Sequence, residues 1–215
     1  TPRLSSAASD VYKRQPEHLH DIGFEIILGN AFHLHQRPGL ETIKKFNGLH
    51  DFMGWDKSIL TDSGGFQIWS LNDLRKITEQ GVEFKSPLDG SKIFMSPEDS
   101  IDTQLTLNSD IIMAFDECTD YPSSYEDAEQ SMHLTHRWTE RSFDYFQKHQ
   151  KGHLLFGIVQ GGMYEELRKQ SLAFMNNLQL DGIALGGLSV GEPKAEKTKI
   201  LKYLAPLLPA NKAHY

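Results

Sequence analysis

Cysteine is nearly absent from this sequence, because Cys118 is the only one among 215 residues. A single cysteine excludes a disulfide within the chain and a zinc site built from several cysteines. No apolar run approaches the roughly 18 residues of a membrane span, and the first residues show no apolar signal segment. These absences, with an ordinary hydrophobic content of 39%, predict a cytoplasmic globular protein.

Positive charge is also scarce. The chain has 22 Lys and Arg against 29 Asp and Glu, a formal net charge of −7. This balance argues against a generally basic surface for nucleic acid, although a local basic patch remains compatible with it.

Residues 1–15 differ from the rest of the chain. They are polar, rich in small residues and without hydrophobic periodicity. We interpret them as a leader or cloning scar, with a natural disordered tail as the alternative, and place the folded domain at residues 16–215.

From residue 16 onward, β-strand and α-helix patterns alternate. Short β-branched or apolar runs predict strands at 25–29, 58–62, 110–115, 154–159 and 182–185. Helices are expected at 37–46, 125–150, 164–178 and 193–207, with another opening at Ser96-Pro97. A β-hairpin is expected at 82–85 and 92–95, around the turn Asp89-Gly90.

This alternation indicates an α/β fold with a parallel sheet, and specifically a (β/α)₈ TIM barrel with an inserted hairpin. Such a barrel needs eight strands and typically about 250 residues. Only about five strand–helix units are visible, and a sixth strand should begin near Ala213. We therefore expect the chain to be the first part of a barrel.

Polar residues or glycines follow each predicted strand, at the positions that share the catalytic face of a barrel. They are Asn30, Asp62, Asp116, Gln160 and Gly187. Asp62 and Asp116 could converge as a carboxylate pair with separated pKa values, suited to acid–base work. Gln160 offers a donor and an acceptor, Gly187 permits close backbone approach, and Phe66 could stack on a flat ligand. The set suits a purine-like base; simple capping of strand ends is the alternative.

Two other patterns carry competing interpretations. Asp62-Ser63-Gly64-Gly65 resembles the nucleophile segment of chymotrypsin-like proteases, but Thr61 and Phe66 depart from that motif and the βαβ pattern contradicts that fold. His33 and His35 could ligate a metal in a barrel hydrolase, although the later strands supply no further histidines. The alternative makes His33 a hydrogen-bonding residue and His35 a surface residue.

A second histidine pair lies on the helix expected at 125–150. His133 and His136 are one helical turn apart there. We interpret them as part of a solvated helix face and not as metal ligands.

Several segments together resemble the bacterial tRNA-guanine transglycosylase family. They are Leu28-Gly-Asn-Ala-Phe-His-Leu34, Arg37-Pro-Gly39, Phe52-Met-Gly-Trp55, Thr61-Asp-Ser-Gly-Gly-Phe-Gln67, Phe115-Asp-Glu-Cys-Thr119, Gly157-Ile-Val-Gln-Gly161 and Gly186-Gly-Leu-Ser-Val-Gly-Glu192. The resemblance runs in order from about residue 16 to the end. It implies a TIM barrel that exchanges guanine at the wobble position of tRNA for a 7-deazaguanine through a covalent RNA–enzyme intermediate.

Carried over position by position, the resemblance assigns roles to these residues. Asp62 matches the catalytic aspartate of proton transfer, Phe66 the aromatic that stacks on the base, and Asp116 with Gln160 the readers of its edge. Gly187 and Leu188 supply backbone contacts. The matching substrate-binding segment also includes Ser63, Gly64 and Gly65. Asn30 and His33 would lie near Asp62 and hold its side chain in position without contacting the substrate.

Cys118 and Val190 stand where bacterial members carry the same residues. This resemblance favours 7-aminomethyl-7-deazaguanine as the incoming base.

Other parts of the family pattern are missing from these residues. The nucleophilic aspartate belongs to a Phe-Asp-Cys-type segment after the sixth strand, and the zinc site uses three cysteines and a histidine. Neither occurs here, nor do the basic residues that grip tRNA and support the homodimer. We expect the chain alone to bind a base without transferring it. A non-catalytic base- or RNA-binding subunit is a further alternative, although retention of both Asp62 and Asp116 argues against it.

Overall fold

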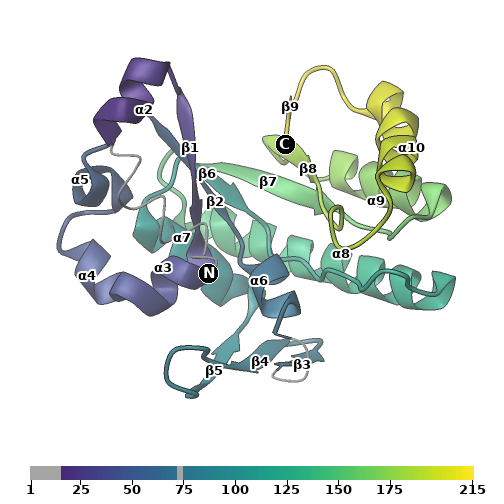
Figure 1. The fold of residues 1–215 in the computed structure, drawn as a ribbon, viewed down its shortest axis with the longest axis horizontal. Coiled ribbons are helices and arrows are strands. Elements are labelled where there is room, and N and C mark those ends of the chain that lie inside the picture. The colour runs from purple at the N-terminus through teal and green to yellow at the C-terminus, as the bar shows by residue number, and fades with distance from the viewer. Residues whose placement is uncertain (1–15, 72–74) are drawn as a thin grey trace, which may run out of the picture.

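The computed structural model describes residues 16–71 and 75–215, so the predicted leader at residues 1–15 lies outside the described residues. Within the described part, six parallel strands form one curled sheet in the order β1-β2-β6-β7-β8-β9 (Figure 1). Their bounds are β1 Ile26–Asn30, β2 Ser58–Asp62, β6 Ile111–Met113, β7 Leu154–Val159, β8 Gly182–Leu185 and β9 Ala213–His214. The spatial order follows the chain order, which is the arrangement of part of a (β/α)₈ barrel.

The strand predictions are confirmed closely where β-branched runs are bounded by polar residues. The predicted ranges 58–62, 154–159 and 182–185 match β2, β7 and β8, whereas β1 is shifted by one residue and β6 is shorter than 110–115. The sixth strand expected near Ala213 is β9, whose Ala213 pairs with Gly182 of β8.

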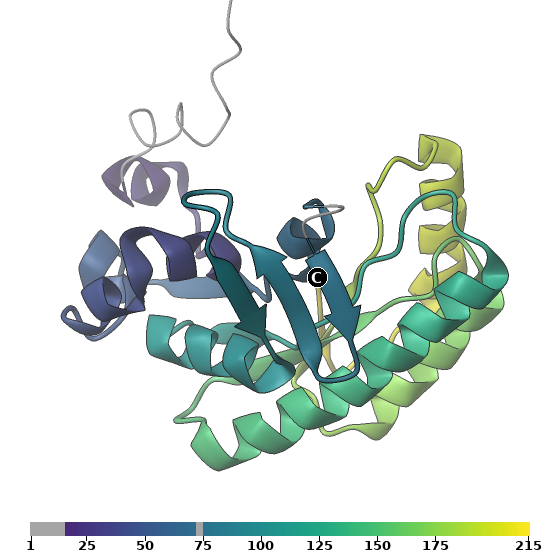
Figure 2. The ribbon, with the colours of Figure 1, turned by 90° about the horizontal axis from the view of Figure 1, so that it is seen from below.

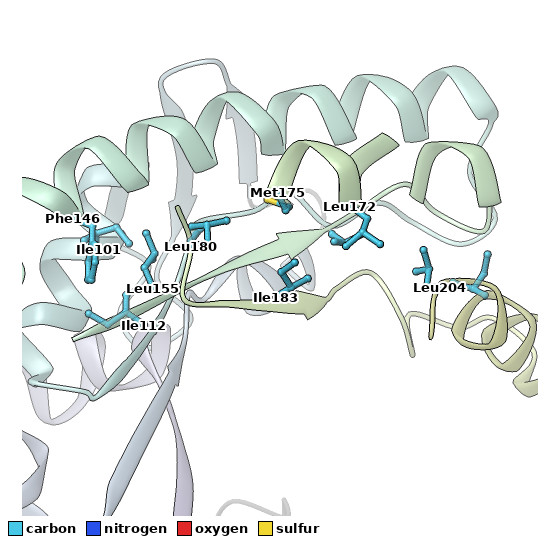
Figure 3. Packing of buried hydrophobic residues seen from close by; sticks show 12 residues of the cluster. Ile101, Ile112, Phe146, Leu155, Leu172, Met175, Leu180, Ile183 and Leu204 are labelled. Carbon is cyan, nitrogen blue, oxygen red and sulfur yellow. The ribbon is translucent and has the colours of Figure 1, made fainter. Parts of the chain in front are cut away.

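Helices cover the convex face of the sheet. The larger ones are α7 Pro97–Leu107, α8 Tyr125–His149, α9 Glu165–Asn177 and α10 Lys194–Leu204. Their apolar side chains form one cluster with the strands, in which Ile112, Leu155 and Ile183 of the sheet meet Phe146 and Met175 of the helices (Figure 3). Burial of this cluster is the main force that fixes the helices on the sheet.

Shorter helices link the first strands. They are α2 Pro16–Ile22, α3 Ala31–Leu34, α4 Leu40–Lys44, α5 Leu49–Met53 and α6 Gly65–Trp69. None of the helices in the described ranges is both long enough and apolar enough to cross a membrane.

The opposite, concave face of the sheet carries its own apolar layer. Its buried members are Leu60, Ile111, Met113, Phe156, Ile158 and Ala184. These residues come from four neighbouring strands, and the parallel register places Leu60 beside Ile111. This layer forms the floor beneath the carboxyl ends of the strands, where the candidate site lies.

The inserted sheet has three antiparallel strands, one more than the predicted hairpin. Strands β4 Gly81–Lys85 and β5 Lys92–Met95 are the predicted pair, and β3 Arg75–Thr78 was missed. The sheet lies against α8 (Figure 2). Trp138 of α8 stacks on Phe115 with ring centroids 5.0 Å apart, and its Nε1 donates to the Glu79 carbonyl in the β3–β4 turn.

The predicted helix over residues 37–46 is wrong at its start. Arg37 has extended backbone angles and Gly39 a φ of +91°, so only α4, beginning at Leu40, is regular there. The reason is local, because a residue that precedes proline is disfavoured in the α conformation and a positive φ interrupts a helix. The turn η1 His35–Gly39 occupies the interval.

Candidate active site

A cavity of about 290 Å³ opens at the carboxyl ends of the strands of the curled sheet. Its volume is at the lower end of the roughly 300–1,000 Å³ typical of small-molecule sites. Eight residues predicted from the sequence line it: Asp62, Ser63, Gly64, Phe66, Asp116, Cys118, Gly187 and Leu188. The structure therefore brings together side chains that lie up to 126 positions apart in the sequence.

Asp116 is the more enclosed of the two carboxyl groups of the cavity, with 8% of its surface exposed. Its Oδ1 accepts a hydrogen bond from Ser63 Oγ at 3.1 Å, and its Oδ2 accepts one from Gln160 Nε2 at 2.8 Å. Burial raises the pKa of this carboxyl, and the two hydrogen bonds oppose the rise. The two hydrogen bonds thus hold the carboxyl in a fixed orientation. In this orientation its oxygens can accept further hydrogen bonds from a flat ligand.

Asp62 lies at the end of β2 and is half-buried. Burial and the neighbouring Asp116 carboxylate raise the pKa of Asp62 to about 6. A carboxyl that titrates near neutral pH can both accept and return a proton under physiological conditions. Of the two carboxylates predicted from the sequence, Asp116 thus adds to the effect of burial on the pKa of Asp62.

Glycines give Asp116 and the chain after β2 the room they need. A Cβ at Gly65 would lie 2.6 Å from both the carbonyl oxygen and Oδ1 of Asp116. Gly64 has a φ of +93°, and a Cβ there would lie 3.0 Å from Phe32 Cβ. Any side chain at either position would push Asp116 or Phe32 aside.

Phe66 lies at the mouth of this pocket, 44% exposed, beside Trp69 at a ring-centroid distance of 5.2 Å. An exposed aromatic ring on the rim can stack on a planar ligand.

Gln160 is buried behind the cavity lining, with 1% of its surface exposed. Its Oε1 has no hydrogen-bond partner among the described residues, so the amide keeps an acceptor to offer to a ligand. Its backbone N–H donates to Ser171 Oγ at 3.1 Å, and the Ser171 hydroxyl in turn contacts His136 Nε2 at 3.2 Å.

The expectation that both histidines of the pair on α8 are solvated is wrong for His136. Its ring is buried and stacks on Phe174 at 4.0 Å, while His133 is exposed. Burial lowers the pKa of His136 to about 4, so the ring is neutral at physiological pH. The sequence contained one signal for this, since His136 lies four residues after Met132, on the apolar face of α8.

The other predicted residues lie around the cavity with different roles. Asn30 is paired in register with Asp62, but its Oδ1 accepts from the His33 backbone N–H at 3.3 Å and caps α3. Cys118 lines the cavity, and burial raises the pKa of its thiol to about 12. Val190 lines a neighbouring cavity of about 280 Å³ that shares Gly187 with the first.

Of the first histidine pair, the interpretation of His35 as a surface residue is wrong, and the supporting role of His33 stays a prediction. His33 is exposed, whereas His35 is half-buried and its Nδ1 is buried without a partner in the described part of the chain. Across residues 16–71 and 75–215 no group of three His, Cys, Asp or Glu side chains is placed to hold a metal ion. This geometry gives no support to a metal-dependent hydrolase built on His33 and His35.

A larger cavity of about 690 Å³ lies between β3 and α8. One of its two arginines, Arg137, is already engaged, because Nε and Nη2 each donate to the Glu79 carboxylate at 2.8 Å. The smaller cavity holds the coupled carboxylates, so we take it as the candidate active site.

The family model for queuine tRNA-ribosyltransferase matches residues 4–215 of this chain. The chain belongs to this family. A queuine tRNA-ribosyltransferase of Psychrobacter sp. (strain PRwf-1) is 56% identical over 200 residues, which cover 93% of this chain and 52% of the relative. Those of Dechloromonas aromatica (strain RCB) and of Neisseria meningitidis serogroup A are 56% and 54% identical, each over 93% of this chain and 54% of the relative.

The chain thus spans about half the length of the curated queuine tRNA-ribosyltransferases it matches. The zinc that the resemblance implies does not fit the residues present: the sole cysteine is buried and strongly disfavoured as a thiolate.

Proposed function

We propose that these residues form the base-recognition part of a tRNA-guanine transglycosylase of queuosine biosynthesis. The enzyme would exchange guanine at the wobble position of tRNA for 7-aminomethyl-7-deazaguanine. The observation that carries the proposal is the buried Asp116 carboxyl, oriented by Ser63 and Gln160 in the same cavity as Asp62. Membership of the queuine tRNA-ribosyltransferase family supports it.

In this proposal each side chain acts on a different part of the base. Asp116 accepts hydrogen bonds from the ring N–H and amino group of guanine, and Gln160 and the Gly187-Leu188 backbone contact the remaining polar edge. Phe66 stacks on the ring from the rim of the cavity. Asp62, with a pKa of about 6, takes and returns the proton that accompanies base exchange.

The glycosyl-transfer step itself needs a nucleophile. In the family that the sequence resembles, this is an aspartate in a Phe-Asp-Cys-type segment, and these 215 residues contain no such segment. We therefore propose that the chain alone binds the base but does not transfer it. Incorporation of radiolabelled guanine into unmodified tRNA by the purified chain would contradict this.

The partners follow from the same proposal. They are tRNA with guanine at the wobble position, the 7-deazaguanine base and, for the whole protein, a second copy in a homodimer. A cytoplasmic location would give the protein access to tRNA. Zinc would be bound by residues other than those of this chain.

Titration calorimetry with guanine and with 7-aminomethyl-7-deazaguanine tests the base site. Asp116→Asn should weaken binding of both bases roughly 10- to 100-fold, because a hydrogen bond to a charged group contributes about 1.5–3 kcal/mol. Asp181→Asn is the matched control, since Asp181 accepts from the Leu155 backbone N–H at the amino end of β8, away from the cavity. Unchanged affinity in Asp116→Asn would refute the proposed site.

A further inference from the structure

Arg168 of α9 is a fully buried arginine, with 0% of its surface exposed. It forms no salt bridge with a carboxylate among the described residues. Burial lowers the pKa of its guanidinium to about 10, so the group stays charged at neutral pH. A buried charge without a counter-ion is costly unless hydrogen bonds compensate it, which makes its partners informative.

The partners of Arg168 are backbone carbonyls of the two loops that follow β7 and β8. Nε donates to Gly162 at 2.8 Å and Nη1 to Val159 at 3.0 Å, both at the end of β7. Nη1 also donates to Gly186 at 2.6 Å, and Nη2 donates to Gly187 at 3.2 Å. Four hydrogen bonds from one planar group thus join the loop that carries Gln160 to the loop that lines the cavity.

These bonds fix the direction of two peptide groups at the cavity. In a trans peptide the N–H points opposite to the C=O. The carbonyls of Gly186 and Gly187 accept from the guanidinium, so the N–H groups of Gly187 and Leu188 point away from it. Both residues are part of the cavity lining. Neither N–H has a hydrogen-bond partner among the described residues.

A side chain at position 187 would be strained and crowded. Gly187 has a φ of +60°, and a Cβ there would collide with Gln160 Oε1 and lie 3.3 Å from Arg168 Nη2. Arg168, Gln160 and Gly187 are therefore packed as one unit behind the cavity lining.

We propose that Arg168 is a positioning residue that orients the Gly187 and Leu188 N–H groups toward a carbonyl oxygen on the edge of the bound base. This inference deepens the proposed function and rests on it. Arg168 does not touch the base; it acts by holding the two peptide groups in one orientation before the base arrives. Such preorganisation lowers the free-energy cost of binding, because the loop is already ordered before the base arrives.

The test compares guanine with 6-thioguanine, which keeps the ring N–H and amino donors but replaces the carbonyl oxygen by sulfur, a weak acceptor. The wild-type chain should prefer guanine. Arg168→Lys keeps the charge but cannot span four carbonyls, so this preference should shrink roughly three- to tenfold, the contribution of one neutral hydrogen bond. A second variant, Arg168→Gln, should shrink it at least as much.

Arg141→Lys is the matched control. Arg141 also donates to two backbone carbonyls, those of Glu79 and Gln80, but it lies outside the cavity lining. Its substitution should leave the preference for guanine over 6-thioguanine unchanged.

Several outcomes would overturn the positioning role. They are an unchanged preference in both Arg168 variants, an equal loss of affinity for both bases, or failure of both variants to fold, which would make Arg168 a purely structural residue. If the wild-type chain binds neither base, the proposed function fails instead. The NMR spectrum of the backbone amides then still tests the positioning role of Arg168. The Gly187 and Leu188 amides should each give a single narrow signal in the wild-type chain and doubled or broadened signals in Arg168→Lys. Unchanged line shapes would overturn the positioning role.

Discussion

At the scale of single residues, the candidate site depends on two carboxyl groups that lack a salt-bridge partner among the described residues. Hydrogen bonds from Ser63 and Gln160 stabilise the charge of Asp116. Asp62 has no comparable support: burial and the Asp116 charge both disfavour its ionised form. The cavity therefore holds one carboxyl in a fixed orientation, that of Asp116, and one whose pKa is raised to about 6, that of Asp62.

Asp62→Asn should stabilise the fold at neutral pH. The folded-state pKa of Asp62 is raised to about 6 from 3.8, so the folded protein binds the proton more tightly than the unfolded chain. Wild-type stability from this group is present below about pH 4 and is lost as pH rises through about 6. The variant should be more stable by about 1–2 kcal/mol above pH 7, allowing for solvent screening at this partly exposed group.

Urea unfolding of both proteins at several pH values measures this difference, which should vanish at pH 4. Asp144→Asn, a change at an exposed position of α8, should show no such pH-dependent gain. A constant difference at all pH values would show that the effect of Asp62→Asn is not a titration.

Some residues in and around the site could be predicted from the sequence, and others could not. Asp62, Asp116 and Gln160 were predictable because they lie at or shortly after the carboxyl ends of apolar strands, and parallel strands bring these ends to one face. Arg168 was not, because a polar residue on a helix is normally exposed, and the burial of His136 was indicated only by its spacing from Met132. Only the packing of their helices against other elements shows that these side chains are buried and that their polar groups have hydrogen-bond partners.

At the scale of elements, local signals predicted those structures that depend on neighbouring residues. Ser96, Pro97 and the acidic residues after them predicted the start of α7, which has a capping box between Ser96 and Asp99. Strand β3 was missed because its residues become a strand only by pairing with β4. Its side chains alternate too weakly in hydrophobicity to mark a strand on their own.

Helix α7 also connects the fold to the site. The Gln104 side chain bonds both the N–H and the C=O of Met113 in β6, and Ser100 Oγ donates to the Ser63 carbonyl at 3.0 Å. Ser96→Ala removes the cap that accepts from the Asp99 N–H at 3.1 Å and should destabilise the protein by about 1 kcal/mol.

Chemical denaturation measures the effect of Ser96→Ala. Thr198→Ala is the control, because the Thr198 hydroxyl donates to the Lys194 carbonyl inside α10 and its loss should change stability by less than about 0.5 kcal/mol. Equal effects of the two substitutions would contradict the cap as the cause.

At the scale of the whole molecule, the curled sheet has two edge strands in the described part of the chain, β1 and β9. Strand β1 pairs only with β2, and two of its apolar side chains are largely exposed: Ile26 at 49% and Leu28 at 57%. The register places Leu28 beside Leu60, so the exposed residues continue the apolar layer of the concave face. An apolar edge strand with free backbone groups is a surface for association.

We therefore expect the purified chain to self-associate through β1 as its concentration rises. Leu28→Lys should raise the dissociation constant at least about tenfold, because burying the new charge at an apolar contact would cost more than about 1.4 kcal/mol. Leu88→Lys is the matched control, since Leu88 is 60% exposed in the β4–β5 turn and its substitution changes the net charge equally. Sedimentation velocity over a concentration series separates the two variants. Equal weakening in both would assign the effect to net charge, and no weakening in Leu28→Lys would show that β1 is not the contact.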